Sequence, residues 1–129
     1  MKRIFALAFG SLLALSAIGS EIASAAPDVA ARGSCSDGAR SRLELKDQGR
    51  RFWVNFEIHM GPFGRDDWRI RIRHNRDLFF DGTRTATGDS GDVKVHRRVR
   101  DRNGIDRIVA RGVDTSTGEV CRAAVEIDL

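Results

Sequence analysis

The chain has 129 residues, with 22 Lys and Arg against 18 Asp and Glu, which gives a formal net charge of +4. A chain of this length predicts one domain with an ordinary hydrophobic core, needing neither a structural metal nor several disulfides. The modest charge does not by itself demand a polyanionic partner.

The N-terminus has the order of a secretory signal peptide. Lys2 and Arg3 precede an apolar run over residues 4–18, and the small residues Ala23-Ser24-Ala25 follow it. A membrane span requires about 20 apolar residues, and this run is shorter. We therefore predict a cleavable signal over residues 1–25 and a soluble, secreted protein that begins at Ala26. Cleavage removes two basic residues and one acidic residue, which changes the net charge from +4 to +3.

The remainder predicts a flexible N-terminal arm over residues 26–34 and a single β domain over residues 35–129. Beyond the arm, apolar residues alternate with polar ones at a period of two, in short runs separated by Gly, Asn and Asp, which is typical of strands. No run after the signal indicates a helix. The expected strands cover 43–46, 52–58, 68–73, 78–80 with a continuation over 83–85, 93–99, 106–113 and 121–129.

About seven short strands at this spacing predict an all-β, antiparallel β-sandwich of immunoglobulin or fibronectin-III type, with a small β-barrel as the alternative. Asn103-Gly104 predicts a tight hairpin turn, and residues 115–118 predict another. Trp68 is expected to lie in the core. Residues 60–67 form the longest expected loop inside the domain.

Two cysteines lie near the two ends of the predicted domain, Cys35 and Cys121. An even number of cysteines in an exported chain favours pairing, because the compartment is oxidising. We therefore predict a structural Cys35–Cys121 disulfide. It requires the first and last strand regions to lie side by side.

Arg69, Arg71 and Arg73 are the one candidate binding site that the sequence offers. They alternate with apolar residues and therefore project from one face of one strand, about 7 Å apart. This spacing suits phosphate, sulfate or an anionic polymer. The whole chain is rich in arginine, however, and acidic residues on neighbouring strands can neutralise these three side chains. The row can therefore also be explained without a ligand.

Other patterns that resemble functional sites are better explained as ordinary structure. Gly88-Asp89-Ser90-Gly91 matches part of a serine-protease motif, but Asp92 replaces the required glycine and the domain is too small for that fold, so a turn explains it. The three histidines have no metal-ligand spacing and are expected to be solvated or to lie across strands. Residues 101–106 lack the glutamate of a calcium loop. We predict no metal, cofactor or catalytic residue.

Several turn and disulfide residues match a known group of proteins. They are Gly33-Ser34-Cys35, Gly49, Trp68, Thr85, Ser90-Gly91, Asn103-Gly104-Ile105-Asp106 and Thr117-Gly118-Glu119-Val120-Cys121. In this order the chain resembles small secreted single-disulfide proteins of high-GC Gram-positive bacteria, although it lacks their aromatic residue near Ala39-Arg40. The resemblance implies a disulfide-linked β-sandwich and no assigned activity.

The sequence therefore predicts a secreted, non-catalytic binding or interaction module. Its expected partner is an anionic cell-envelope polymer or another protein, and nothing indicates specific binding of nucleic acid. The alternative is a small secreted hydrolase or enzyme inhibitor with a site built from loops. A hollow containing a nucleophile and a base would favour the enzyme, and a flat charged surface would favour the module.

Overall fold

The computed structural model describes residues 28–128, so the predicted signal over residues 1–25 lies outside the described part. This part is all β, and it contains no helix that could cross a membrane. Its strands are β1 (Asp28–Arg32), β2 (Ser34–Cys35), β3 (Arg40–Asp47), β4 (Arg51–His59), β5 (Asp67–His74), β6 (Asp77–Thr85), β7 (Asp92–Arg100), β8 (Ile105–Asp114) and β9 (Val120–Asp128).

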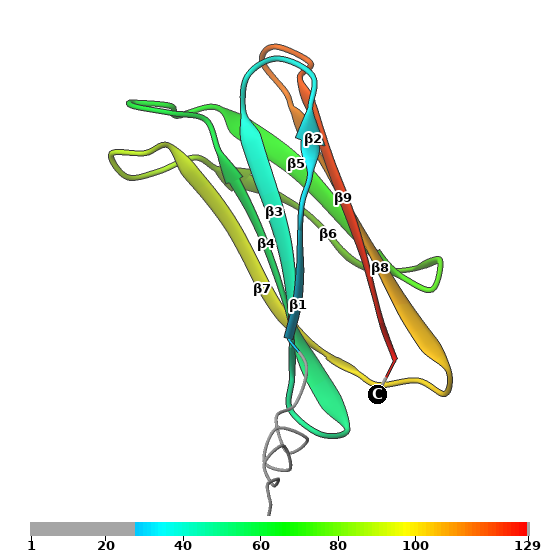
Figure 1. The fold of residues 1–129 in the computed structure, drawn as a ribbon. Helices are drawn as coiled ribbons and strands as arrows, with labels where there is room; N and C mark the ends of the chain where they lie inside the picture. The colour runs from blue at the N-terminus through cyan, green and yellow to red at the C-terminus, as the bar shows by residue number, and fades with distance from the viewer. Residues whose placement is uncertain (1–27, 129) are drawn as a thin grey trace, which may run out of the picture.

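The strands form two antiparallel sheets packed face to face (Figure 1). One sheet has the order β1-β3-β4-β7, and the other has the order β2-β9-β8-β5-β6. The predicted sandwich is confirmed. The barrel alternative is wrong, because the two sheets remain separate and are not closed by pairing of their edge strands.

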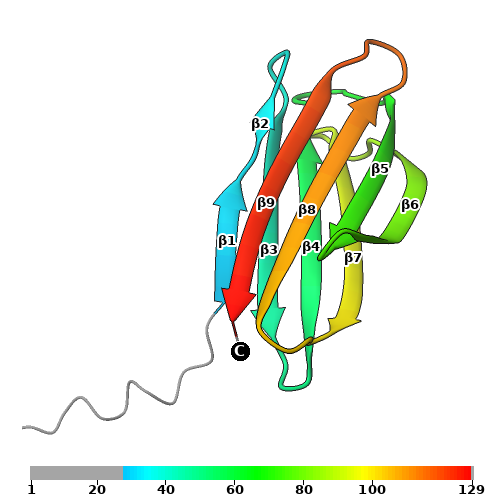
Figure 2. The ribbon, with the colours of Figure 1, turned by 90° about the vertical axis from the view of Figure 1, so that its right-hand side faces the viewer.

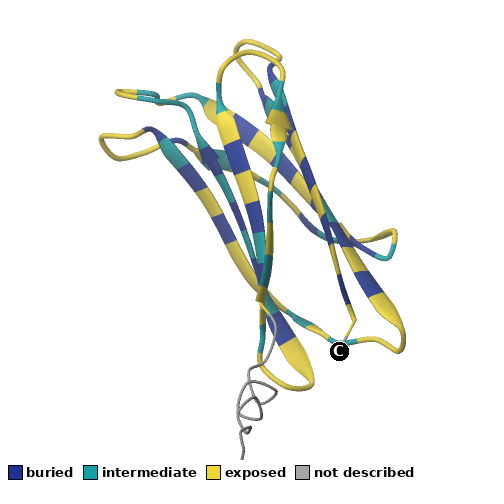
Figure 3. Ribbon diagram, viewed as in Figure 1, coloured by how far each residue is buried: buried dark blue, intermediate teal, exposed yellow. Residues whose placement is uncertain are grey.

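The core lies between the sheets and follows the period of two that the sequence displays (Figure 3). Along β4 and β5 every second residue is buried, and Trp68 at the start of β5 is fully buried as predicted. The largest fully buried side chains are Trp68, Phe52, Phe56, Leu43, Leu45, Ile58, Ile70, Ile72, Ile108, Val54, Val93 and Val95.

The N-terminal segment differs from the expected flexible arm. Residues 28–32 form β1, which pairs with β3, and residues 34–35 form β2, which pairs with β9. Val29 and Ala31 pack against the core from β1. The pattern is difficult to detect in the sequence, because its few apolar positions are small and alanine is a poor strand former. These two short strands explain why the structure has nine strands where about seven were expected.

Asn103-Gly104 does not form the predicted hairpin. Gly104 has the positive φ of a turn, 83°. However, β7 pairs with β4, while β8 pairs with β5 and β9, so this turn carries the chain from one sheet to the other. The amide of Asp101 donates to the carbonyl of Arg50, at 2.8 Å, which fixes the departing chain to the β3–β4 turn instead of to β8. The expected hairpin over residues 115–118 does join β8 to β9.

The predicted disulfide joins Cys35 of β2 to Cys121 of β9. The two residues are direct partners in the strand register, so the bond links the beginning of the fold to its last strand. Beside it, the buried carboxylate of Glu119 accepts the amides of Asp37 and Ala39, at 2.8 and 2.9 Å. These bonds fix the β2–β3 loop against β9.

Arg97 interrupts the apolar face of β7 because it covers an open edge of the sandwich. Its guanidinium lies 4.9 Å from the ring centre of Phe80, and that of Arg84 lies 5.0 Å from the same ring. The two cations shield Phe80 where β6 and β7 are not paired with each other.

Candidate functional site

Arginines of neighbouring strands lie in register on the outer face of the five-stranded sheet, the face that Figure 2 presents to the viewer. Arg71 of β5 pairs with Arg111 of β8, and Arg111 pairs with Arg122 of β9. Neighbouring strands are about 5 Å apart. The three side chains therefore form a row across the strands, roughly perpendicular to the row that the sequence predicts along β5.

The complete group is called here the arginine face. Its members are exposed and comprise Arg69, Arg71, Arg73, Arg76, Arg107, Arg111 and Arg122.

Two members of the predicted row share a single carboxylate, which offsets one of their two positive charges. Arg69 donates two hydrogen bonds to Asp81 of β6, both at 3.1 Å, and Arg71 lies 3.5 Å from the same carboxylate. The hydrogen bond from Arg69 lowers the pKa of Asp81, so this group stays ionised across the neutral range. Of the three arginines singled out in the sequence, Arg73 has no carboxylate within ion-pair distance among the described residues.

The remaining positive charge lies at positions that the sequence did not single out. Arg76, Arg107, Arg111 and Arg122 form no ion pair with any described residue. The alternation of β8 and β9 could have placed three of them on the outer face. Their proximity to β5 depends on the strand order, which cannot be predicted from the alternation of residue types.

Three of these arginines, together with Arg73, border a hollow of about 490 Å³ at the β5–β6 turn. Its lining consists of Arg73, Asn75, Arg76, Arg107, Val109 and Arg122. No acidic side chain lines it. The surface therefore offers charged hydrogen-bond donors for an anion and a small apolar patch for an uncharged carbon skeleton attached to it.

The three histidines lie in three different surroundings. His59 of β4 bonds through Nδ1 to Asp92 of β7, at 2.5 Å, and His96 stacks on Trp53, with ring centres 4.0 Å apart. These two are cross-strand histidines, as expected. His74 differs, because it is buried against Asp106, with Nε2 and Oδ1 2.5 Å apart.

A second hollow, of about 370 Å³, is lined by Asp89 and Ser90 of the partial protease motif. His59 and Ser90 both line it, together with Arg40. The Asp92 carboxylate holds the other side of the His59 ring. A nucleophile, a base and an orienting carboxylate thus occur together, although no hydrogen bond joins Ser90 to His59 among the described residues.

Two acidic groupings have structural explanations. Cys35, Cys121 and Glu119 lie close enough to hold a metal ion, but the disulfide removes the thiolates that would bind it. Asp101 and Asp106, which resemble part of a calcium loop, share a side-chain hydrogen bond. That bond raises the pKa of Asp101.

Comparison with known proteins does not assign the chain to a family. No family model matches the sequence, and no curated protein or solved structure matches it either.

Proposed function

We propose that this protein is a secreted, non-catalytic β-sandwich module that binds an anionic polymer of the cell envelope through the arginine face. The observation that carries the proposal is the register of Arg71, Arg111 and Arg122 across three strands. Among the described residues, Asp81 lies opposite Arg71 and Glu126 lies opposite Arg107, and Asp81 is already bound to Arg69 and Arg71.

The chemistry of the side chains suits phosphate or sulfate groups. A guanidinium presents parallel N–H donors that match the oxygens of these groups. Side chains about 5 Å apart across strands and about 7 Å apart along them can contact successive charges of a flexible polymer. We therefore take a polymer linked by phosphodiester groups as the partner.

Retention on immobilised poly(glycerol phosphate) teichoic acid tests this function. We expect binding at low salt and release as the ionic strength rises, because each phosphate contact displaces counterions. Arg71→Ser, Arg111→Ser and Arg122→Ser together should abolish retention. A matched triple variant with the same loss of charge, Arg50→Ser, Arg98→Ser and Arg100→Ser, should retain most of it.

The controls separate this proposal from general basicity and from other partners. Equal loss in both triple variants would assign retention to net charge and overturn the proposal. Stronger retention on duplex DNA than on teichoic acid would replace the envelope polymer by a nucleic acid. Heparin serves as the sulfated comparison.

Export is part of the same proposal. The signal pattern and the disulfide both favour an oxidising compartment outside the cytosol. N-terminal sequencing of protein recovered from the culture fluid should read Ala26 first. Recovery of the uncleaved chain in the membrane fraction would contradict export and cleavage.

The second candidate function is a serine hydrolase at the hollow between His59 and Ser90. It is supported by the 2.5 Å contact of His59 Nδ1 with Asp92, which leaves Nε2 free to accept a proton from a nucleophile. Covalent labelling by a fluorophosphonate, abolished by Ser90→Ala and by His59→Ala, would establish it. Absence of labelling in the folded wild-type protein would exclude it.

A further inference from the structure

The β5–β6 turn has an unusual residue at its tightest position. Asn75 and Arg76 are its two central residues, with φ values of 47° and 82°. Two positive φ values define the turn that the twist of a two-residue hairpin favours, and the second position strongly prefers glycine. An arginine there adopts a backbone conformation that its side chain disfavours.

Hydrogen bonds fix this turn against its neighbours. The amide of Asn75 donates to the carbonyl of Arg107, at 2.9 Å, and the Asn75 side-chain oxygen accepts the amide of Arg107, at 2.7 Å. Arg73 donates to the carbonyl of Arg76, at 3.1 Å. Arg102 also donates to the carbonyl of His74, at 3.3 Å, and to Asp77, at 2.9 Å. The turn is therefore organised before any ligand arrives.

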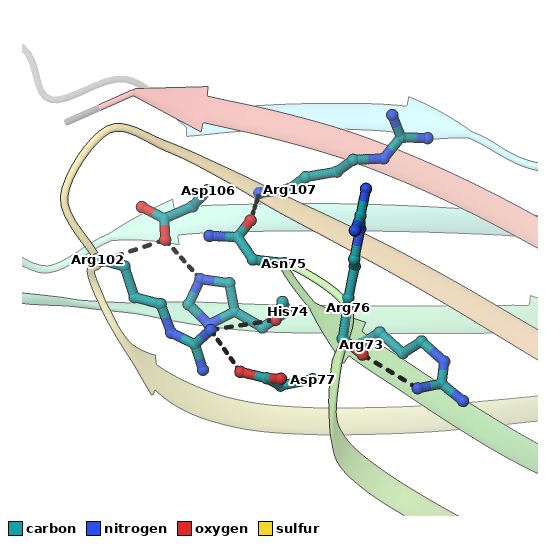
Figure 4. Close-up of polar contacts among 8 residues, drawn as sticks. All are labelled: Arg73, His74, Asn75, Arg76, Asp77, Arg102, Asp106 and Arg107. Carbon is teal, nitrogen blue, oxygen red and sulfur yellow. Dashed lines mark hydrogen bonds and ion pairs between the residues drawn. The ribbon is translucent and has the colours of Figure 1, made fainter.

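The arginine side chains around the turn border the hollow. Figure 4 shows Arg73, Arg76 and Arg107 extending to the same side of the turn, away from the buried pair of His74 and Asp106. The oxygen of the Asn75 amide accepts the backbone amide of Arg107, and its NH2 group lies on the side of Asp106 in Figure 4. Val109 lies in the hollow between these donors.

We infer that this hollow is the anchoring site for one phosphate group of the bound polymer, and that the guanidinium of Arg76 contacts this group from a position that favours glycine. The inference rests on the proposed function and specifies the site within the arginine face. Arg73, Arg107 and Arg122 supply the other charged donors, and Val109 contacts the carbon skeleton next to the phosphate.

Arg76→Gly distinguishes a binding role from a structural one. Glycine accepts the φ of 82° without strain, so the denaturant midpoint of this variant should equal or exceed that of the wild type. Its affinity for teichoic acid should nevertheless fall about tenfold, the loss of one charge-assisted contact. Arg76→Lys keeps the charge but loses the planar fork, so its affinity should fall between the two.

The matched control is Arg50→Gly, which removes one charge from the β3–β4 turn outside the arginine face. It should change the affinity less than twofold. Titration of the isotope-labelled wild-type protein with inorganic phosphate should shift the Arg76 guanidinium signals first.

The outcomes separate the two proposals. Retention of the wild type with unchanged affinity in Arg76→Gly overturns the anchoring site and leaves the arginine face intact. A loss of affinity accompanied by a lower denaturant midpoint would assign Arg76 a structural role and also overturn it. Absence of wild-type retention overturns the proposed function itself.

Discussion

His74 Nε2 and Asp106 Oδ1 lie 2.5 Å apart in the core, where the end of β5 meets the start of β8. Their side chains are 3% and 0% exposed. Asp106 also accepts the amide of Arg102, at 3.2 Å, so one buried carboxylate links the end of the sheet to the β7–β8 connection.

His74→Ala should therefore be strongly destabilising. Removal of the ring leaves a buried carboxylate without its main partner, and breaking such a pair costs about 3–5 kcal/mol. Urea unfolding of the variant should show this loss. The double variant His74→Phe with Asp106→Leu leaves no unpaired charge, so it should lose less than His74→Ala. A loss below about 1 kcal/mol for His74→Ala would contradict a role in stability.

A pair of carboxyl groups gives the domain a measurable pH dependence. Asp114 is buried at the end of β8, and its carboxylate accepts the amides of Ser116 and Thr117, at 2.8 and 3.2 Å. The hydrogen bond between the Asp66 and Asp114 carboxyl groups raises the pKa of Asp66. Burial opposes ionisation of Asp114, but the hydrogen bonds from Asp66, Ser116 and Thr117 lower its pKa.

The sign of the effect follows from these two shifts. A raised pKa at Asp66 stabilises the fold at low pH, and this contribution is lost as the pH rises through the raised pKa. The lowered pKa of Asp114 contributes stability above its ordinary value that is lost as the pH falls through the lowered pKa. Between these two pKa values, Asp66 donates its proton to an ionised Asp114.

Asp66→Asn tests this pair, because an amide donates to Asp114 at every pH. The free energy of unfolding of the variant relative to the wild type should increase from mildly acidic to neutral pH. Other titrating groups cancel in this difference. Parallel stability curves for the two proteins would show that Asp66 and Asp114 do not share a proton.

Gly33 is the position where the chain passes from one sheet to the other, between β1 and β2. A Cβ at this position would lie 2.1 Å from Ser41 Oγ and 2.6 Å from the carbonyl oxygen of Arg122. Gly33→Ala should lower the free energy of unfolding by about 1–3 kcal/mol, because the backbone of β9 cannot move aside as a side chain can.

The second contact provides the control for this prediction. Adding Ser41→Ala to Gly33→Ala removes the hydroxyl but leaves the carbonyl of Arg122 in place. In a Ser41→Ala background, Gly33→Ala should therefore still lower the free energy of unfolding, but by less than it does in the wild type. A wild-type midpoint for Gly33→Ala would mean that β1 and β2 can separate from the sandwich at little cost.

The alternation of residue types predicts the parts of this fold that depend on one strand at a time. Trp68, Ile70 and Ile72 indicate both a strand and its buried face, and the structure agrees. His74 continues the same alternation and is buried, but a polar residue gives no signal of its buried partner Asp106, which lies 32 residues away.

The features that the sequence did not predict depend on which strands are neighbours. Asn103-Gly104 specifies a turn but not whether the turn joins strands of one sheet or of two. The row formed by Arg71, Arg111 and Arg122 likewise exists only because β8 lies between β5 and β9. Of the three predicted site residues, Arg73 borders the hollow, because it lies at the end of β5 next to the turn, whereas Arg69 and Arg71 lie farther along the strand beside Asp81.

The disulfide between Cys35 and Cys121 is expected to contribute strongly to stability. Their separation of 86 positions closes a long loop, which removes denatured-state entropy worth about 4–5 kcal/mol in the chain-entropy model, an upper value. This is comparable to the whole stability of a small domain. Cys35→Ser with Cys121→Ser should therefore lower the denaturant midpoint steeply or prevent folding.

The control for the disulfide prediction must separate the lost bond from a change in packing. Cys121 is fully buried, so serine there also places a hydroxyl in the core. Cys35→Ala with Cys121→Val removes the bond without adding a polar group, and it should still lose most of the stability. β2 contains only two residues, so its amides should exchange fastest in this variant. Mass measurement after alkylation without reductant should find no free thiol in the wild type. An unchanged midpoint in both double variants would contradict the structural role of the bond.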